Sequence, residues 1–226
     1  MEFQLASLWE ALVDGGPDHC CLVVGDERRT RRSLDDRANQ LAHHLLAAGI
    51  GRGDRIGLCT YNRIEHVEAM LACWKISAVP INLNYRYVAD ELAYVWADAD
   101  LSGTIAEATF APVITEVLGR LGHEADMARH LVINDGSNIG AGHSMTNYED
   151  ALAGQLSDRG FGQVRSADDL YVIYTGGTTG FPKGVMLSHA NLVTSGLGTV
   201  ATGQLLDDAS ILLHAAPMFH LADLAA

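Results

Sequence analysis

The sequence predicts an α/β fold in which mostly parallel strands are flanked by helices. Short apolar runs typical of buried strands alternate with segments whose apolar residues recur at helical spacing, and this alternation continues along most of the chain. Of the 226 residues, 48% are hydrophobic and 19% are charged, a balance typical of a folded protein. We therefore expect right-handed crossovers between strands and a sheet covered on both faces.

The individual elements follow from apolar periodicity and from turn residues. The clearest helix has apolar residues from Leu34 to Leu46 on one stripe, with Thr30 or Ser33 as its N-cap. Glycine-rich stretches at 49–54 and 134–147 are predicted to be a turn and a loop. In chain order we expect a helix at 4–13, an apolar run at 21–24, a helix near 34–46, a strand at 55–60, a helix at 64–74, a strand at 79–83, a helix near 88–95, a strand at 103–106, a helix at 112–121, a strand at 130–133, a helix at 148–152 and a strand at 170–174.

Composition argues against several classes of function. The 28 acidic residues outnumber the 15 Lys and Arg residues, giving a net charge of −13, so we expect no general attraction to nucleic acid or anionic membranes. No apolar run approaches the roughly 20 residues that span a bilayer, and the amino terminus lacks a signal-peptide pattern. The four cysteines are too few and too irregular for a disulfide scaffold and are interpreted as buried thiols. These features predict a cytoplasmic protein without a membrane span or a nucleic-acid partner.

The segment that carries chemistry is a loop rich in glycine and threonine, directly after the predicted strand at 170–174. Residues 175–184 read TGGTTGFPKG. Glycines allow backbone N–H groups to converge on an anion, threonine hydroxyls add donors or support a metal ion, and Lys183 adds a mobile positive charge. Lys183 is also the only Lys or Arg between residues 166 and 226. The sequence therefore predicts a phosphate-binding loop.

Other interpretations of this loop are weaker. A simple surface hairpin is the structural alternative, because Gly and Thr are common in turns. The pattern GxxxxGK[ST] is not met, since Pro182 and Gly184 flank Lys183, and GxGxxG is absent. P-loop NTPases and dinucleotide-binding dehydrogenases are therefore disfavoured.

The segment YTGGTTGFPKG resembles the phosphate-loop signature of the adenylate-forming enzymes: acyl-CoA synthetases, aryl-CoA ligases, peptide-synthetase adenylation domains and luciferases. The stretch containing NYRY is most similar to bacterial fatty-acyl-CoA synthetases. The resemblance implies an incomplete N-terminal domain of the acyl-CoA synthetase/luciferase-like fold, spanning residues 1–226, with a soft subdomain boundary near 154–167. The family's adenine, ribose and C-terminal catalytic Lys motifs would lie beyond residue 226. The other matching stretches, in the family's usual order, are 35–49, 62–72, 74–83, 84–92 and 215–220.

The resemblance also implies a two-step reaction and its site residues. A carboxylate, here expected to be a fatty or other hydrophobic acid, attacks the α-phosphorus of Mg²⁺-ATP, and the thiol of CoA then displaces AMP. His220, in the stretch PMFH, is implied to shape or gate the carboxylate site, and Lys183 is implied to act on the phosphates. The residues implied to hold the β- and γ-phosphates are Thr175, Gly176, Gly177, Thr178, Thr179, Gly180 and Lys183.

The chain departs from the family pattern in places. Gly176 stands where many members have Ser or Thr, Ser77 replaces a usual glycine, and Leu221 rather than a small residue follows His220. An isolated chain of this length is expected to expose apolar surface, and therefore to aggregate or form a homodimer.

Two functional alternatives remain open: a non-catalytic remnant that binds phosphate or nucleotide, and part of an amino-acid-activating adenylation domain.

Other candidate residues are interpreted structurally. The ten histidines show no convincing metal-ligand spacing, so no metal site formed by protein side chains is predicted. Ser188 is interpreted as a helix N-cap rather than a nucleophile. The three tryptophans are expected to pack on helical faces.

Overall fold

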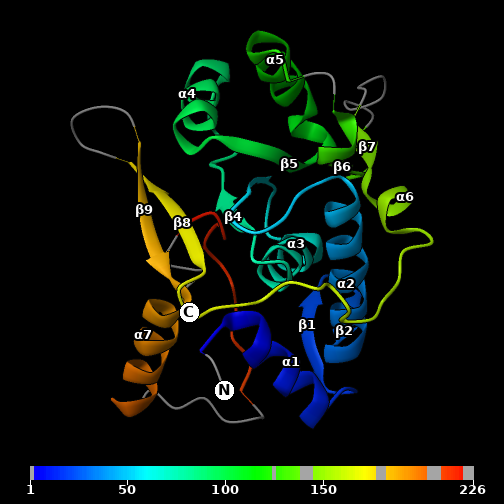
Figure 1. Cartoon of the computed structure of the whole chain (residues 1–226), viewed down its shortest axis with the longest axis vertical. Coiled ribbons are helices and arrows are strands. Elements are labelled where there is room, and N and C mark those ends of the chain that lie inside the picture. Colours follow the sequence, from blue (N-terminus) through cyan, green and yellow to red (C-terminus); the bar gives the residue numbers. More distant parts are fainter. Residues whose placement is uncertain (1–2, 124–125, 138–144, 177–181, 203–209, 221–226) are drawn as a thin grey trace.

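The computed structural model describes residues 3–123, 126–137, 145–176, 182–202 and 210–220. Its centre is a seven-stranded sheet in which six strands run parallel and only the last, at one edge, pairs antiparallel (Figure 1). The predicted α/β fold with mostly parallel strands is confirmed. In spatial order the strands are β7 (Thr146–Asn147), β6 (His130–Ile133), β5 (Leu101–Glu107), β3 (Arg55–Cys59), β4 (Val79–Asn82), β8 (Leu170–Thr175) and β9 (Lys183–Ser188).

Helices cover both faces of this sheet, as expected. One core packs α2 (Arg31–Ala47), α3 (Ile64–Lys75) and α6 (Tyr148–Leu152) against the strands. The other core packs α4 (Ala89–Ala99) and α5 (Ala111–Leu121) against the opposite face. Figure 1 shows β5 and β6 between these two layers. The two apolar layers together hold the central strands in place.

The remaining elements lie around this three-layer body. Helix α1 (Leu5–Gly15) contacts α2 and α3, and α7 (His189–Ala201) follows β9. A separate antiparallel pair is formed by β1 (Cys20–Val24) and β2 (Glu27–Thr30). Two short 3₁₀ helices cover Ala108–Phe110 and Met127–Arg129. Within the described ranges, no helix combines the length and apolar composition that a bilayer crossing requires.

Two predicted helix caps can be compared directly with the structure. Thr30, rather than Ser33, is the N-cap of α2: its side chain accepts the N–H of Ser33, and the Ser33 hydroxyl in turn accepts the N–H of Thr30. Ser188 caps α7 by accepting the N–H of Asn191, so its interpretation as a cap is confirmed. Both caps satisfy N–H groups that the first helical turn leaves unbonded.

The interpretation of all four cysteines as buried thiols is wrong for two of them. Cys59 and Cys73 are buried, and burial raises the pKa of each thiol to about 12. Cys20 and Cys21 are exposed, because β1 pairs only with β2 and has no helical layer over both of its faces. The apolar run at 21–24 therefore forms an outlying strand rather than a core strand.

The stretch at 154–167, predicted as a soft boundary, is tied to the first two helices. Arg165 forms an ion pair with Glu10 of α1 at 2.6 Å, and Arg159 forms one with Asp35 of α2 at 3.0 Å. Buried Lys75 bonds both of these carboxylates, at 2.8 and 2.7 Å. Charged contacts thus hold this stretch against the helical layer, and the subdomain division stays a prediction.

Candidate active site

Those predicted site residues that the structure describes lie at the carboxyl edge of the parallel strands. The chain leaves β3 for α3 on one face of the sheet and leaves the adjacent strand β5 for α5 on the other face. Such a reversal leaves a crevice beyond the strand ends, where open α/β sheets bind ligands. The predicted phosphate loop follows β8 at this same edge.

Strands β8 and β9 bring two of the predicted phosphate ligands together. Thr175, the last residue of β8, lies directly opposite Lys183, the first residue of β9. Directly opposed residues of an antiparallel pair place their side chains on one face, so the hydroxyl and the ammonium flank the ends of the loop together. Both residues are exposed, and the Thr175 hydroxyl donates to the backbone carbonyl of Lys183 at 3.5 Å.

The loop therefore begins and ends on a hairpin, which was the structural alternative. A hairpin is compatible with an anion site, because paired strands hold the backbone of Thr175 and Lys183 in place. Gly176 is exposed, and open space surrounds the position a Cβ would take. The other predicted ligands, Gly177, Thr178, Thr179 and Gly180, lie outside the described residues.

Gly184 has a packing role beside Lys183. It lies opposite Tyr174, and a Cβ added there would stand 3.2 Å from the tyrosine ring and 3.3 Å from Val172. The Tyr174 hydroxyl donates to Asp98 of α4 at 2.6 Å, and burial followed by the Asp98 carboxylate raises the pKa of this phenol. The glycine thus lets an aromatic side chain cover the hairpin and anchor it to α4.

His220 lies on a turn that reaches the same edge of the sheet. Its N–H donates to the carbonyl of Pro217 at 2.9 Å, which closes a turn over Pro217–His220. The backbone of Met218, inside this turn, is bonded by two asparagines: its N–H donates to Asn62 at 2.7 Å and its carbonyl accepts from Asn82 at 3.0 Å. Asn62 follows β3, and Asn82 ends β4.

Sequence reasoning did not single out either asparagine. Asn62 appeared only as the first residue of a matching stretch, and Asn82 only within another. Their positions could have indicated a functional role. Both are polar residues at or just after the carboxyl end of an otherwise apolar strand, which is where parallel sheets place functional groups.

Aromatic side chains gather beside this turn. The ring of Phe219 stands edge-on to Tyr85 with centroids 5.0 Å apart, and Tyr85 stacks on Phe110 at 5.8 Å. Tyr61 contacts both Tyr85 and Phe110. Tyr85 belongs to the NYRY stretch, so that motif contributes to an apolar wall at the carboxyl edge.

Charged groups near this wall are paired. Glu107, at the end of β5, accepts the N–H of Tyr61 at 2.5 Å and forms an ion pair with Arg63 at 3.0 Å. Burial is the largest influence on its carboxyl group and raises its pKa, against the effect of both partners. His66 is fully buried, bonds the Thr60 hydroxyl at 2.7 Å and has its pKa lowered to about 4 by burial. Neither group is arranged as a solvent-exposed acid or base.

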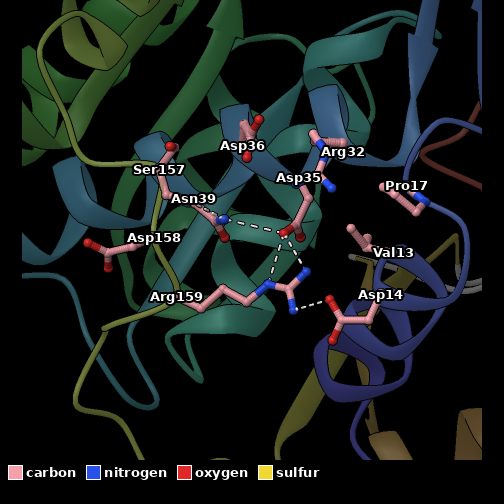
Figure 2. A pocket seen from close by; sticks show the side chains of 10 residues that line it. All are labelled: Val13, Asp14, Pro17, Arg32, Asp35, Asp36, Asn39, Ser157, Asp158 and Arg159. Atoms are coloured by element: carbon pink, nitrogen blue, oxygen red, sulfur yellow. Dashed lines mark hydrogen bonds and ion pairs between the residues drawn. The ribbon is translucent and has the colours of Figure 1, made fainter.

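A cavity of about 370 Å³ lies elsewhere, between α1, α2 and the stretch at 157–159 (Figure 2). Figure 2 shows Arg159 bonded to both Asp35 and Asp14, and Asn39 bonded to Asp35. Arg159 pairs with the carboxylates of Asp35 and Asp14, whereas the buried Oδ1 of Asn39 has no hydrogen-bond partner among the described residues. None of the predicted site residues lines the cavity. We interpret the side chains that line this cavity as a structural ion-pair cluster.

Within the described part of the chain, no group of three or more His, Cys, Asp or Glu could hold a metal ion.

Comparison with known proteins identifies the family. Residues 9–226 match the model of the AMP-binding enzymes. The chain belongs to this family. It is 40% identical over 210 residues to the medium/long-chain-fatty-acid–CoA/3-oxocholest-4-en-26-oate–CoA ligase of Mycobacterium marinum, which covers 90% of the chain and 38% of that relative. It is also 39% identical over 193 residues to the 3-oxocholest-4-en-26-oate–CoA ligase of Rhodococcus rhodochrous. That match covers 85% of this chain and 34% of the relative.

Experimental structures agree with this family assignment. The ATP-bound MatB structure from Rhodopseudomonas palustris superposes with a TM-score of 0.81 and 28% identity, covering 99% of this chain and 42% of that one. The resemblance to the adenylate-forming family and the N-terminal-domain fold are therefore confirmed. This AMP-binding chain spans about two fifths of the length of the curated relatives it matches.

Proposed function

We propose that this AMP-binding chain supplies the phosphate-binding part of an ATP-dependent ligase that converts a fatty or other hydrophobic acid into its acyl-adenylate and then its acyl-CoA. The observation that carries the proposal is the pairing of Thr175 with Lys183 at the two ends of the Gly/Thr loop. The names of the curated relatives, which are ligases of fatty or steroid acids and CoA, support the substrate class.

The proposed chemistry follows from the charge that must be stabilised. When the carboxylate attacks the α-phosphorus, negative charge develops on the departing pyrophosphate. The Thr175 hydroxyl, the loop backbone and the Lys183 ammonium would bond its β- and γ-oxygens, with Gly177, Thr178, Thr179 and Gly180 completing the loop. Donors placed in advance stabilise a transition state by about 3–4 kcal/mol each.

Mg²⁺ would neutralise further phosphate charge when it enters with ATP. Threonine hydroxyls are compatible with a magnesium–phosphate complex, because Mg²⁺ in such sites is held mostly by phosphate oxygens and water. His220 would act at the other substrate, shaping or gating the carboxylate site from the turn at 217–220. Location in the cytoplasm and assembly as a homodimer stay predictions.

The phosphate-binding role can be tested on this chain alone, because it contains only two lysines. Lys75 is fully buried in ion pairs, whereas Lys183 is exposed. An amine-acylating reagent should therefore modify Lys183 quickly and Lys75 slowly, as measured by mass spectrometry. MgATP or magnesium tripolyphosphate should slow the reaction at Lys183 and leave Lys75 unchanged. Equal reaction of Lys183 with and without these ligands would contradict the proposed role.

The chain covers 38% of its M. marinum relative, so the activity is tested in a chimeric enzyme. Residues 1–226 would replace the matching part of the M. marinum relative, and acid-dependent ATP–pyrophosphate exchange would be measured. Lys183→Ala should lower the exchange rate by about 10²–10³-fold. Arg120→Ala, which removes an exposed cation bonded to Asp90 and Glu116, is the matched control and should change little.

The same assay separates the alternatives. Exchange that depends on fatty acids supports the proposal. Exchange that depends on amino acids would instead favour the amino-acid-activating alternative. Protection of Lys183 in the isolated chain without exchange in the chimera would favour the phosphate-binding remnant.

A further inference from the structure

We propose that Asn62 and Asn82 are positioning residues that set the placement of the Pro217–His220 turn, and through it of His220 and Phe219. The catalytic consequence of this inference rests on the proposed function. The positional consequence does not, and it can be measured separately.

The amide of Asn62 is fully engaged by one short segment. Its Nδ2 donates to the carbonyls of His214 at 3.1 Å and Ala216 at 2.8 Å, and its Oδ1 accepts the N–H of Met218 at 2.7 Å. Because these three bonds go to alternate residues, they fix both the position of the segment relative to Asn62 and the direction in which it runs. They join residues 152 to 156 positions apart in the chain.

Asn82 holds the other side of the same peptide unit. Its Nδ2 donates to the carbonyl of Met218 at 3.0 Å and to the hydroxyl of Tyr171 at 2.9 Å. The side chain of Asn82 is 3% exposed, so these bonds form away from bulk water, where losing a partner is costly. Met218 therefore has both its backbone polar groups bonded by side chains: Asn62, which lies just after β3, and Asn82, which ends the neighbouring strand β4.

Contacts from outside the turn add to its own hydrogen bond. Its own internal bond is the one between the His220 N–H and the Pro217 carbonyl, and Met218 is the second residue of the turn. Phe219 adds an apolar contact, since its ring packs against Tyr85 just after β4. The amides of Asn62 and Asn82 and the ring of Tyr85 thus contact the turn from three different segments of the chain.

The phosphate donors are held by a different structure. Thr175 and Lys183 stand on the β8–β9 hairpin, which Tyr174 and the strand ladder stabilise. Loss of Asn62 should therefore disturb how the acid is placed while leaving phosphate binding intact. A general loss of folding would affect both substrates together.

The positional test uses hydrogen–deuterium exchange of this chain, followed by mass spectrometry. Asn62→Ala should speed exchange in the peptide covering 214–220 by about tenfold, the effect of losing one net hydrogen bond, and leave 170–175 unchanged. Asn62→Asp keeps the acceptor for Met218, but it replaces the two donors with a carboxylate oxygen that repels the carbonyls of His214 and Ala216, so it should also speed exchange. Asn82→Ala provides a second variant that should speed exchange in the same peptide.

Asn147→Ala is the matched control. Asn147 caps α6 by accepting the N–H groups of Glu149 and Asp150, so its loss destabilises the chain without touching the turn. If Asn62→Ala and Asn82→Ala leave exchange at 214–220 no faster than Asn147→Ala does, the positioning role is wrong.

The catalytic test uses the chimeric ligase. Asn62→Ala should raise KM for the acid by about tenfold, while kcat and KM for MgATP stay within about twofold. Equal losses for both substrates would show a structural role only. If the unsubstituted chimera has no exchange activity, the proposed function fails, and the deuterium-exchange result still decides the positioning role.

Discussion

Lys183 lies directly across the β8–β9 ladder from Thr175, so that an ammonium and a hydroxyl share one face of the hairpin. Strand pairing sets their proximity, and each remains exposed at the end of a loop whose sequence is typical of phosphate binding. Strand pairing therefore fixes the backbone positions of both residues beside the loop before a ligand arrives, which reduces the ordering that binding must supply. The Thr175 hydroxyl donates to the Lys183 carbonyl at 3.5 Å, a long bond that a bound phosphate would have to replace.

Replacement of the hydroxyl tests this relationship. Thr175→Val keeps the shape and the β-propensity of the residue but removes its donor. We expect the tripolyphosphate concentration that half-protects Lys183 from acylation to rise by about tenfold, as for loss of a hydrogen bond to a charged group. Thr199→Val, on the exposed face of α7, is the control and should leave protection unchanged. Full protection at the original concentration would exclude the hydroxyl as a ligand.

Two glycines allow a matched test of the packing at the hairpin. Gly184→Ala should lower the free energy of unfolding by about 1–3 kcal/mol, because the new Cβ would crowd Tyr174 and Val172. Gly198→Ala, in the middle of α7 with open space around it, should raise it by about 0.5–1 kcal/mol. Urea denaturation followed by circular dichroism measures both changes. A neutral Gly184→Ala variant would mean that the tyrosine ring does not cover this position.

Three buried histidines predict an acid-sensitive fold. Burial lowers the pKa of His66, His130 and His189 to about 4, so each is neutral in the folded state, whereas the unfolded chain takes up protons near pH 6.5. Their contribution to stability is therefore present above pH 6.5 and is lost as the pH falls from 6.5 towards 4. The loss approaches roughly 3 kcal/mol for each histidine.

Comparing the parent chain with a histidine variant shows how much of the pH dependence of stability comes from that histidine. Glu68 and Glu107 act in the opposite sense, because burial raises the pKa of their carboxyl groups. Urea denaturation of the parent chain and of His66→Gln at pH 7, 5.5 and 4.5 isolates one histidine. The substituted chain should lose less stability between pH 7 and 4.5 than the parent does. Parallel losses in both chains would show that His66 does not contribute.

Exposed apolar residues on β9 predict self-association. Met186 is 71% exposed and Val185 is 42% exposed on this edge strand, which among the described strands pairs only with β8. Edges of this kind invite pairing with a second chain. Light scattering should show association that rises with concentration, and Met186→Lys should reduce it. Association unaffected by this charge would place the contact elsewhere.

Much of the fold was predictable from the sequence, because local patterns encode it. These patterns depend on residues only a few positions apart. Examples are the apolar stripe of α2, the apolar run of β8 and the glycines that end helices and form turns. Strand β2 was not predicted, since Glu27–Thr30 carries no apolar alternation and forms only by pairing with β1. Strand β9 was missed for a related reason: much of Lys183–Ser188 is exposed, so its strand character comes from pairing with β8.

The candidate site divides in the same way. The sequence by itself determined the family, and it predicted a phosphate loop at 175–184 that contains one cation, because these are properties of contiguous residues. Only the tertiary structure decided that Lys183 faces Thr175 and that Asn62 and Asn82 bond Met218. Those contacts join residues that are distant in sequence, and they arise because parallel strands bring their carboxyl ends to one edge of the sheet.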